Sequence, residues 1–140
     1  MITLEWTILA QGYSIDRETG SVSIFRMIDE ITLPNAVPDH QPAAPVPITM
    51  PVNMLHQWTR SDAESGAGIS ARVKILDPGR NQLAEAALVI AFDNALKART
   101  VATLAAMPFT VPGDYRIVTE LEKNGAWEER GVLILPIKRL

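Results

Sequence analysis

Apolar and polar side chains alternate with a period of two along much of this chain. The clearest run is ISARVKI, residues 69–75, in which every second side chain is apolar. Successive side chains of a β-strand point to opposite faces, so this run predicts a strand with one buried and one solvated face. Residues 115–121 (YRIVTEL) alternate in the same way. Residues 2–10 (ITLEWTILA) do so too, which predicts that Trp6 lies on the buried face with Ile2 and Leu4.

Other segments are apolar at both parities. Residues 83–92 (LAEAALVIAF) therefore predict a strand that is covered on both sides. Residues 131–138 (GVLILPIK) are similar, but Pro136 has no N–H to donate, so this strand is expected to meet a sheet edge or its own end there. The parity also changes within residues 22–33. Either both faces are covered, or a β-bulge near Phe25 and Arg26 shifts the phase.

Turn signals separate these runs. Asn124–Gly125 supplies the positive φ values of a type I′ hairpin turn, and DPGRN at 77–81 is a second turn. The charged stretch DRETG at 16–20 is interpreted as a hairpin loop in which Asp16 and Thr19 bond local backbone groups. Turns every 10 to 15 residues are typical of an antiparallel sandwich or barrel.

Two segments are less regular. Residues 95–106 (ALKARTVATLAA) could form a strand or, in part, a helix; strand is favoured because Thr100, Val101 and Thr103 are β-branched. Residues 34–51 hold six of the ten prolines, which predicts an extended connection between two sheets. The 33 residues before it are too few for a separate domain, so residues 1–140 are expected to form one domain.

Composition narrows the classes of function. The net charge is −3 without a basic stripe, so no nucleic-acid partner is expected. The chain has no cysteine, which excludes thiol catalysis and cysteine-ligated zinc. The N-terminus lacks the pattern of a signal peptide and no window resembles a membrane span, so a soluble, cytoplasmic protein is predicted.

Two pieces of the sequence, residues 10–31 and 107–137, carry a family resemblance. The matching positions are Asp16, Thr19, Gly20, Ser23, Asp29, Ile31, Phe109, Pro112, Gly113, Tyr115, Asn124 and Gly125. In this respect the chain resembles an uncharacterised bacterial family of small β-domain proteins, a domain of unknown function. It departs from that pattern at residues 26–28 and in having Asn124 rather than aspartate. The resemblance implies an immunoglobulin-like sandwich and brings no catalytic residues.

The predicted fold is thus an all-β, antiparallel, immunoglobulin-like β-sandwich of seven or eight strands. The sequence VPGDYRI fits this fold independently, because a tyrosine that follows a Pro-Gly turn often ties a sandwich corner to upstream backbone. Tyr115 is expected to have that structural role.

The candidate functional residues are few. His40 lies beside Asp39 in the proline-rich segment, and His56 shares a strand parity with Trp58. An Asp-His pair can hold a metal or orient a base, but three or four spaced ligands are not recognisable, and no cofactor is predicted. Trp58 and Trp127 lie near charged residues at strand ends and could stack on a ligand or anchor a partner.

We therefore expect a non-catalytic protein-binding or assembly module that works through a sandwich face, an edge strand or residues 34–51. Exposed edges invite either a homodimer or a partner strand. Its candidate surface residues are Trp58, Trp127, His56 and His40. The alternative is a small-ligand or metal-dependent enzyme with a site near Asp39, His40 and His56. A third hypothesis is a carbohydrate-binding surface formed by Trp58 and Trp127.

Overall fold

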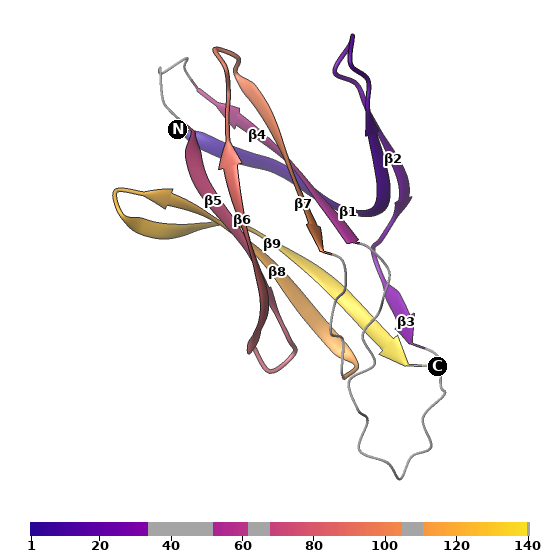
Figure 1. Cartoon of the computed structure of the whole chain (residues 1–140). Helices are drawn as coiled ribbons and strands as arrows, with labels where there is room; N and C mark the ends of the chain where they lie inside the picture. Colours follow the sequence, from indigo (N-terminus) through magenta and orange to yellow (C-terminus); the bar gives the residue numbers. More distant parts are fainter. Residues whose placement is uncertain (34–51, 62–67, 105–110, 140) are drawn as a thin grey trace.

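The computed structural model describes residues 1–33, 52–61, 68–104 and 111–139 (Figure 1). These residues form nine strands and no helix. The strands are β1 (Ile2–Ile15), β2 (Val22–Met27), β3 (Ile31–Leu33), β4 (Val52–Arg60), β5 (Ile69–Leu76), β6 (Gln82–Ile90), β7 (Lys97–Leu104), β8 (Gly113–Lys123) and β9 (Ala126–Arg139). The all-β expectation is confirmed. The count exceeds the expected seven or eight, in part because the three-residue β3 is too short to show a period of its own.

The strands form two sheets. Sheet A has the order β2-β1-β4-β7, and sheet B has the order β3-β9-β8-β5-β6. All pairs are antiparallel except β3 with β9, which is parallel and departs from the expected all-antiparallel arrangement. β3 follows β2 of sheet A in the chain but pairs in sheet B. No hairpin joins β3 to β9, so the two strands are free to pair in parallel.

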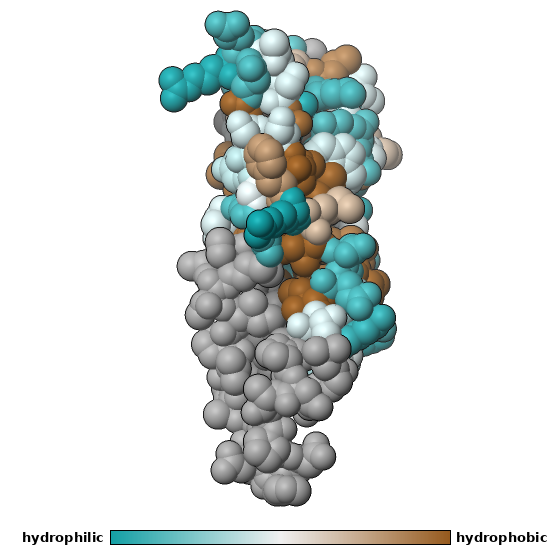
Figure 2. Space-filling view, turned by 90° about the vertical axis from the view of Figure 1, so that its right-hand side faces the viewer, coloured by the Kyte–Doolittle hydropathy of each residue, from teal (hydrophilic) through white to brown (hydrophobic). Residues whose placement is uncertain are grey.

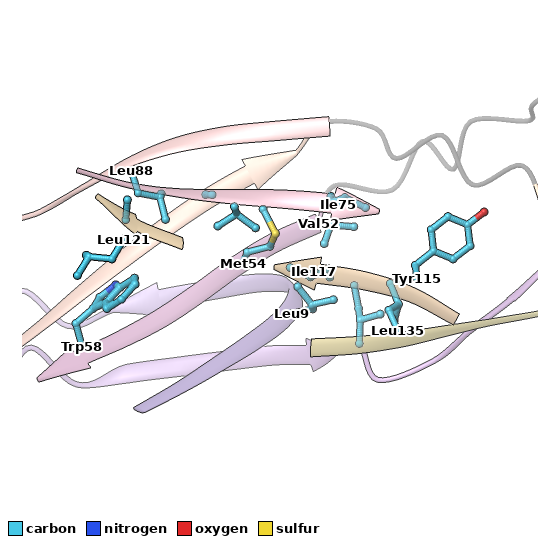
Figure 3. Close-up of a cluster of buried hydrophobic side chains, with 14 of the residues drawn as sticks. Leu9, Val52, Met54, Trp58, Ile75, Leu88, Tyr115, Ile117, Leu121 and Leu135 are labelled. Atoms are coloured by element: carbon cyan, nitrogen blue, oxygen red, sulfur yellow. The ribbon is translucent and has the colours of Figure 1, made fainter. Parts of the chain in front are cut away.

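The core fills the space between the two sheets (Figure 3). Sheet A contributes Leu9, Val52, Met54 and Trp58, and sheet B contributes Ile75, Leu88, Tyr115, Ile117, Leu121 and Leu135. The predicted buried faces of residues 69–75 and 115–121 are confirmed, because their alternate side chains from Ala71 to Ile75 and from Tyr115 to Leu121 are buried.

The N-terminal strand corrects one expectation. Its register with β4 shifts between Leu4 and Trp6, so that Leu4 pairs with Trp58 but Trp6 pairs with Gln57. This one-residue irregularity reverses the parity of the rest of the strand. Ile2 and Leu4 pack against the core as predicted. Trp6 instead lies on the outer face of sheet A with Gln57, and is only partly buried.

The turns behave as predicted. Asn124 and Gly125 have φ values of 53° and 78° in the β8–β9 hairpin. The Tyr115 hydroxyl donates to the Val111 carbonyl at 2.8 Å and accepts from the Val111 N–H at 3.3 Å, which confirms its role at the corner.

Residues 97–104 are strand, as favoured for the ambiguous segment, while 105–106 and the proline-rich 34–51 lie outside the described residues.

Two strands are less covered than their sequences predict. β6 is not covered on both sides: it is the last strand of sheet B, and its Val89 is 67 % exposed. β9 leaves Val132 and Ile134 exposed on the outer face of sheet B. Pro136 pairs with Asp114 of β8, and β9 continues past it to Arg139 with β3 on its other side from Ile137, so the expected edge or strand end at Pro136 is not found.

Candidate interaction surface on the β1–β2 arm

The β1–β2 hairpin leaves sheet A before it ends. Pairing between β1 and β4 stops at Ala10 and Asn53, whereas pairing with β2 continues to Ile15 and Val22. Figure 1 shows β1 changing direction and running back beside β2 along one side of the molecule. We call residues 11–27 the β1–β2 arm. A two-stranded hairpin alone is marginally stable in water, so the arm depends on contacts at its base and tip.

Side chains of sheet A supply those contacts. At the base, Asn53 Nδ2 donates to the Gln11 carbonyl at 2.9 Å and to the Ala10 carbonyl at 3.4 Å. The Asn53 side-chain oxygen accepts from the Thr103 hydroxyl at 2.7 Å. At the tip, the Arg99 guanidinium on β7 donates to the Gly20 carbonyl. The arm is therefore held at both ends by residues of β4 and β7.

The tip itself is an ordered turn. Asp16 Oδ1 accepts the backbone N–H groups of Glu18 and Thr19, each at 2.8 Å, and Gly20 has a φ of 71°. The hydrogen bonds from Thr19 and Glu18 lower the pKa of Asp16. The Thr19 hydroxyl accepts from the Ser21 N–H at 3.2 Å. The prediction that Asp16 and Thr19 bond local backbone groups is confirmed.

The arm exposes large apolar side chains on both of its faces. Tyr13 and Ile15 are 38 % and 45 % exposed, and Phe25 and Met27 are 54 % and 62 % exposed. The register places Phe25 and Met27 on the opposite face of the hairpin from Tyr13 and Ile15. Figure 2, which views the side of the molecule on which β2 lies, shows apolar side chains running down it between hydrophilic ones. Clusters of exposed apolar groups of this kind mark interaction surfaces.

β2 has a backbone irregularity at Arg26, the place that the sequence singled out, but it is not the expected phase-shifting bulge. Arg26 has a positive φ of 54°, and its guanidinium lies 3.4 Å from the Gln11 side-chain oxygen. The register with β1 nevertheless stays constant on both sides of Arg26. The strand is therefore twisted at Arg26 without shifting phase. Both alternatives offered by the sequence are therefore wrong: Phe25 and Met27 are exposed, so the two faces are not both covered, and no bulge shifts the phase near Phe25 and Arg26.

Two of the predicted surface residues are buried. Trp58 and His56 are both 0 % exposed, so neither can form an accessible binding surface. Their strand, β4, is an inner strand of sheet A, and their shared parity directs them toward sheet B. Trp58 Nε1 donates to the Thr100 hydroxyl at 2.9 Å. The charged neighbour Arg60 suggested exposure, but it lies at the strand end beyond the core.

His56 stands in a buried polar position between the sheets. Its Nε2 lies 3.3 Å from the Thr119 hydroxyl, and its ring stacks near Trp58 with centroids 6.1 Å apart. Its Nδ1 is buried without a hydrogen-bond partner. Burial lowers the pKa of His56 to about 4. The imidazole is therefore neutral at pH 7 and enclosed by the core.

The other candidates do not join it. Asp39 and His40 lie outside the described residues. Among the residues that the structure does describe, no group of three or more histidine, aspartate or glutamate side chains could hold a metal ion. A pocket of about 680 Å³ lies near the N-terminus, where Ile2, Ile69 and Leu121 meet charged side chains of the β8–β9 hairpin. His56 does not line it.

Trp127 lies on the other sheet. It is 37 % exposed, and the Arg72 guanidinium stacks over its ring 4.1 Å from the centroid. Arg72 also lies 3.3 Å from Glu120, which Lys74 contacts at 2.8 Å. Because Trp58 is buried, Trp58 and Trp127 do not form an exposed surface together, and the carbohydrate-binding hypothesis loses its basis.

The sequence missed the arm as a site because its apolar side chains resemble ordinary strand residues. The phase change within residues 22–33 was the available signal. No protein-family model matches the chain, and no curated protein is significantly similar to it. The described residues include no helix of the length and apolarity needed to cross a membrane.

Proposed function

We propose that this protein is a non-catalytic protein-binding module that uses the β1–β2 arm to hold an extended apolar segment of a partner protein. The observation that carries the proposal is the exposure of Phe25 and Met27 beside the unpaired edge of β2. Strand addition supplies main-chain hydrogen bonds, while alternate side chains of the added segment meet apolar groups on each face.

The proposal includes the finer features expected from the sequence. The sandwich is of immunoglobulin-like type, the protein is cytoplasmic, and it is related to the domain of unknown function that it resembles. The corner made by Tyr115 and Val111 supports the immunoglobulin-like type, since sandwiches of that type use the same contact. The enclosure of His56 in the core supports a non-catalytic role, because a substrate cannot reach its imidazole.

The test is a comparison of captured proteins between matched variants. The double variant Phe25→Ser, Met27→Ser removes the apolar side chains from one face of the arm. The control Val132→Ser, Ile134→Ser removes two side chains of similar exposure (45 % and 43 %) from sheet B. Tagged proteins would be used to capture partners from the host lysate, after thermal unfolding has shown that all three are folded.

We expect at least one protein that the wild type and the control capture in stoichiometric amount and the arm variant does not. Purified, that partner should bind the wild type and fail to bind the arm variant in a titration. If the arm variant captures the same proteins in the same amounts as the wild type, the arm is not the binding surface and the proposal fails.

A further inference from the structure

Among the residues that the structure describes, the two sheets end in four strands that each have an unpaired edge: β2 and β7 in sheet A, and β3 and β6 in sheet B. Unpaired N–H and C=O groups of an edge strand can pair with another chain, and proteins usually block such edges by short length, a twist or charge. β3 has three residues, β7 exposes Lys97 and Arg99, and β2 belongs to the β1–β2 arm described above.

β6 is the least protected of the four, because its one charged side chain, Glu85, already faces Arg72 of its own sheet. It is the longest of the four, with nine residues, and contains no proline, glycine, lysine or arginine. Its register with β5 is regular from Ile69 and Ile90 to Ile75 and Ala84. Its outer face presents Ala87 and the 67 % exposed Val89 to solvent. The strand is apolar on both faces although only one of them is covered.

The side chains of β6 are complementary to a second copy of the same strand. Antiparallel pairing about a two-fold axis at Ala86 uses all nine residues, with Gln82 opposite Ile90 of the second copy. Small residues then face larger ones, because Ala84 lies opposite Leu88 and Ala87 lies opposite Glu85. Such reciprocal contacts are what an interface with two-fold symmetry requires.

Charge also favours a second copy as the occupant. Glu85 is the one ionisable residue of β6, and Arg72 on β5 lies 3.7 Å from it. The neighbouring Lys74 is paired with Glu120 at 2.8 Å, so the outer face beside this edge is balanced. In the symmetric register the two Glu85 side chains are diagonal neighbours, and each keeps its own Arg72. Two copies can therefore approach without strong repulsion.

We propose that this protein forms a homodimer in which β6 pairs antiparallel with β6 of a second copy about an axis at Ala86, joining the two B sheets into one. This surface is separate from the β1–β2 arm, and the proposal does not depend on the proposed function. Pairing of single edge strands buries less than the standard interface of about 1,200–2,000 Å². The dimer should accordingly dissociate on dilution.

The first test uses the absence of cysteine from the chain. In the variant Ala86→Cys the two new thiols would face each other across the axis, where paired Cα atoms lie about 4.5–5.5 Å apart, within disulfide range. The matched control is Ala84→Cys, on the same face of the same strand. Its two copies would be separated by four residues, or about 13 Å along the strand.

We expect mild oxidation to convert Ala86→Cys, and not Ala84→Cys, to a disulfide-linked dimer. Light scattering of the wild type should give a mass that rises from monomer to dimer with concentration. The proposal is overturned if the wild type stays monomeric at every concentration, or if both cysteine variants cross-link at the same rate.

The second test checks the register by charge. Ala87→Glu would place a carboxylate opposite Glu85 of the second copy, and Ala87→Lys would place an ammonium there. Ala87→Glu should raise the dissociation constant of the dimer several-fold, and Ala87→Lys should leave that constant unchanged or lower it. Equal effects would overturn the proposed register. If the Phe25→Ser, Met27→Ser variant no longer dimerises, the dimer interface is the arm and the β6 proposal is overturned. If the arm captures no partner protein, the proposed function fails but the β6 dimer is still expected.

Discussion

The Asn53 side chain donates to the Gln11 carbonyl at the point where β1 leaves β4 and begins the arm. The contact is largely buried, because Asn53 is 8 % exposed. Beyond Ala10, β1 has no β4 partner to accept its polar groups, and an unpaired buried carbonyl is costly. A side-chain amide suits this position, because its oxygen accepts from the Thr103 hydroxyl while its nitrogen donates to the Gln11 carbonyl, where β1 leaves β4.

Asn53→Ala should therefore lower the free energy of unfolding by about 1–3 kcal/mol, the usual cost of leaving a buried polar group without its partner. Denaturant titration measures this change. The matched variant Thr103→Val removes one hydroxyl from the same network and should cost less, about 0.5–1.5 kcal/mol. Because both act through one network, the effects of the double variant should not add. Additive effects would contradict the coupling, and unchanged stability in Asn53→Ala would contradict its role in the bend.

Much of this fold could be predicted from the sequence because its signals are local. Asp16, Asn124 and Gly125 specify their turns through their own backbone and side-chain preferences. Tyr115 could be placed at a corner because the proline and glycine before it mark one.

The features that could not be predicted depend on neighbours that the sequence does not name. The irregularity between Leu4 and Trp6 reverses the parity of a strand, and no residue there demands it. A period of two also says which side chains share a face, not whether anything covers that face. β6 and β4 are both rich in apolar residues, yet one is an edge strand and the other an inner strand. Trp58 is buried although the charged Arg60 follows it closely, because β4 has a neighbouring strand on each side and faces sheet B.

Tyr115→Phe tests the corner. The variant keeps the buried ring and removes the hydroxyl that bonds the Val111 carbonyl at 2.8 Å. The free energy of unfolding should fall by about 0.5–1.5 kcal/mol, the net worth of one hydrogen bond. Thermal or denaturant unfolding measures the loss. A variant as stable as the wild type would show that the corner is held by packing of the ring alone.

Glu120→Gln tests the charged row on sheet B. Burial alone would raise the pKa of Glu120, but hydrogen bonds and charge from Lys74 and Arg72 outweigh it and lower the pKa. Replacement leaves both cations without this carboxylate and should cost roughly 1–3 kcal/mol at pH 7. The stabilisation by Glu120 is present above its unfolded pKa and is lost as the pH falls through its lower folded value. The difference between wild type and variant should therefore shrink in acid.

Glu85→Gln is the matched control for that row. Glu85 is more exposed and contacts Arg72 at 3.7 Å, so its replacement should change stability by less than about 1 kcal/mol. Equal losses in the two variants would contradict the greater weight given to Glu120.

His56 also makes the free energy of unfolding depend on pH, because burial keeps its imidazole neutral in the folded protein. Its pKa is lowered from 6.5 to about 4 because the charged imidazole is disfavoured in the core. Below pH 6.5 the unfolded chain binds a proton that the folded chain refuses, so stability falls as the pH drops and levels off near pH 4. A shift of this size corresponds to about 3 kcal/mol lost across that window. Denaturant titrations at pH 7, 5.5 and 4.5 measure it.

His56→Gln keeps a polar side chain near Thr119 and removes the titrating group. The variant should lose much less stability than the wild type between pH 6.5 and 4, whatever its stability at pH 7. The remaining slope then reports the carboxylates, which both proteins share. If wild type and variant lose stability in parallel, His56 takes up its proton in the folded state near pH 6.5. It would then have to be reachable by water, which its enclosure between Trp58 and Thr119 argues against.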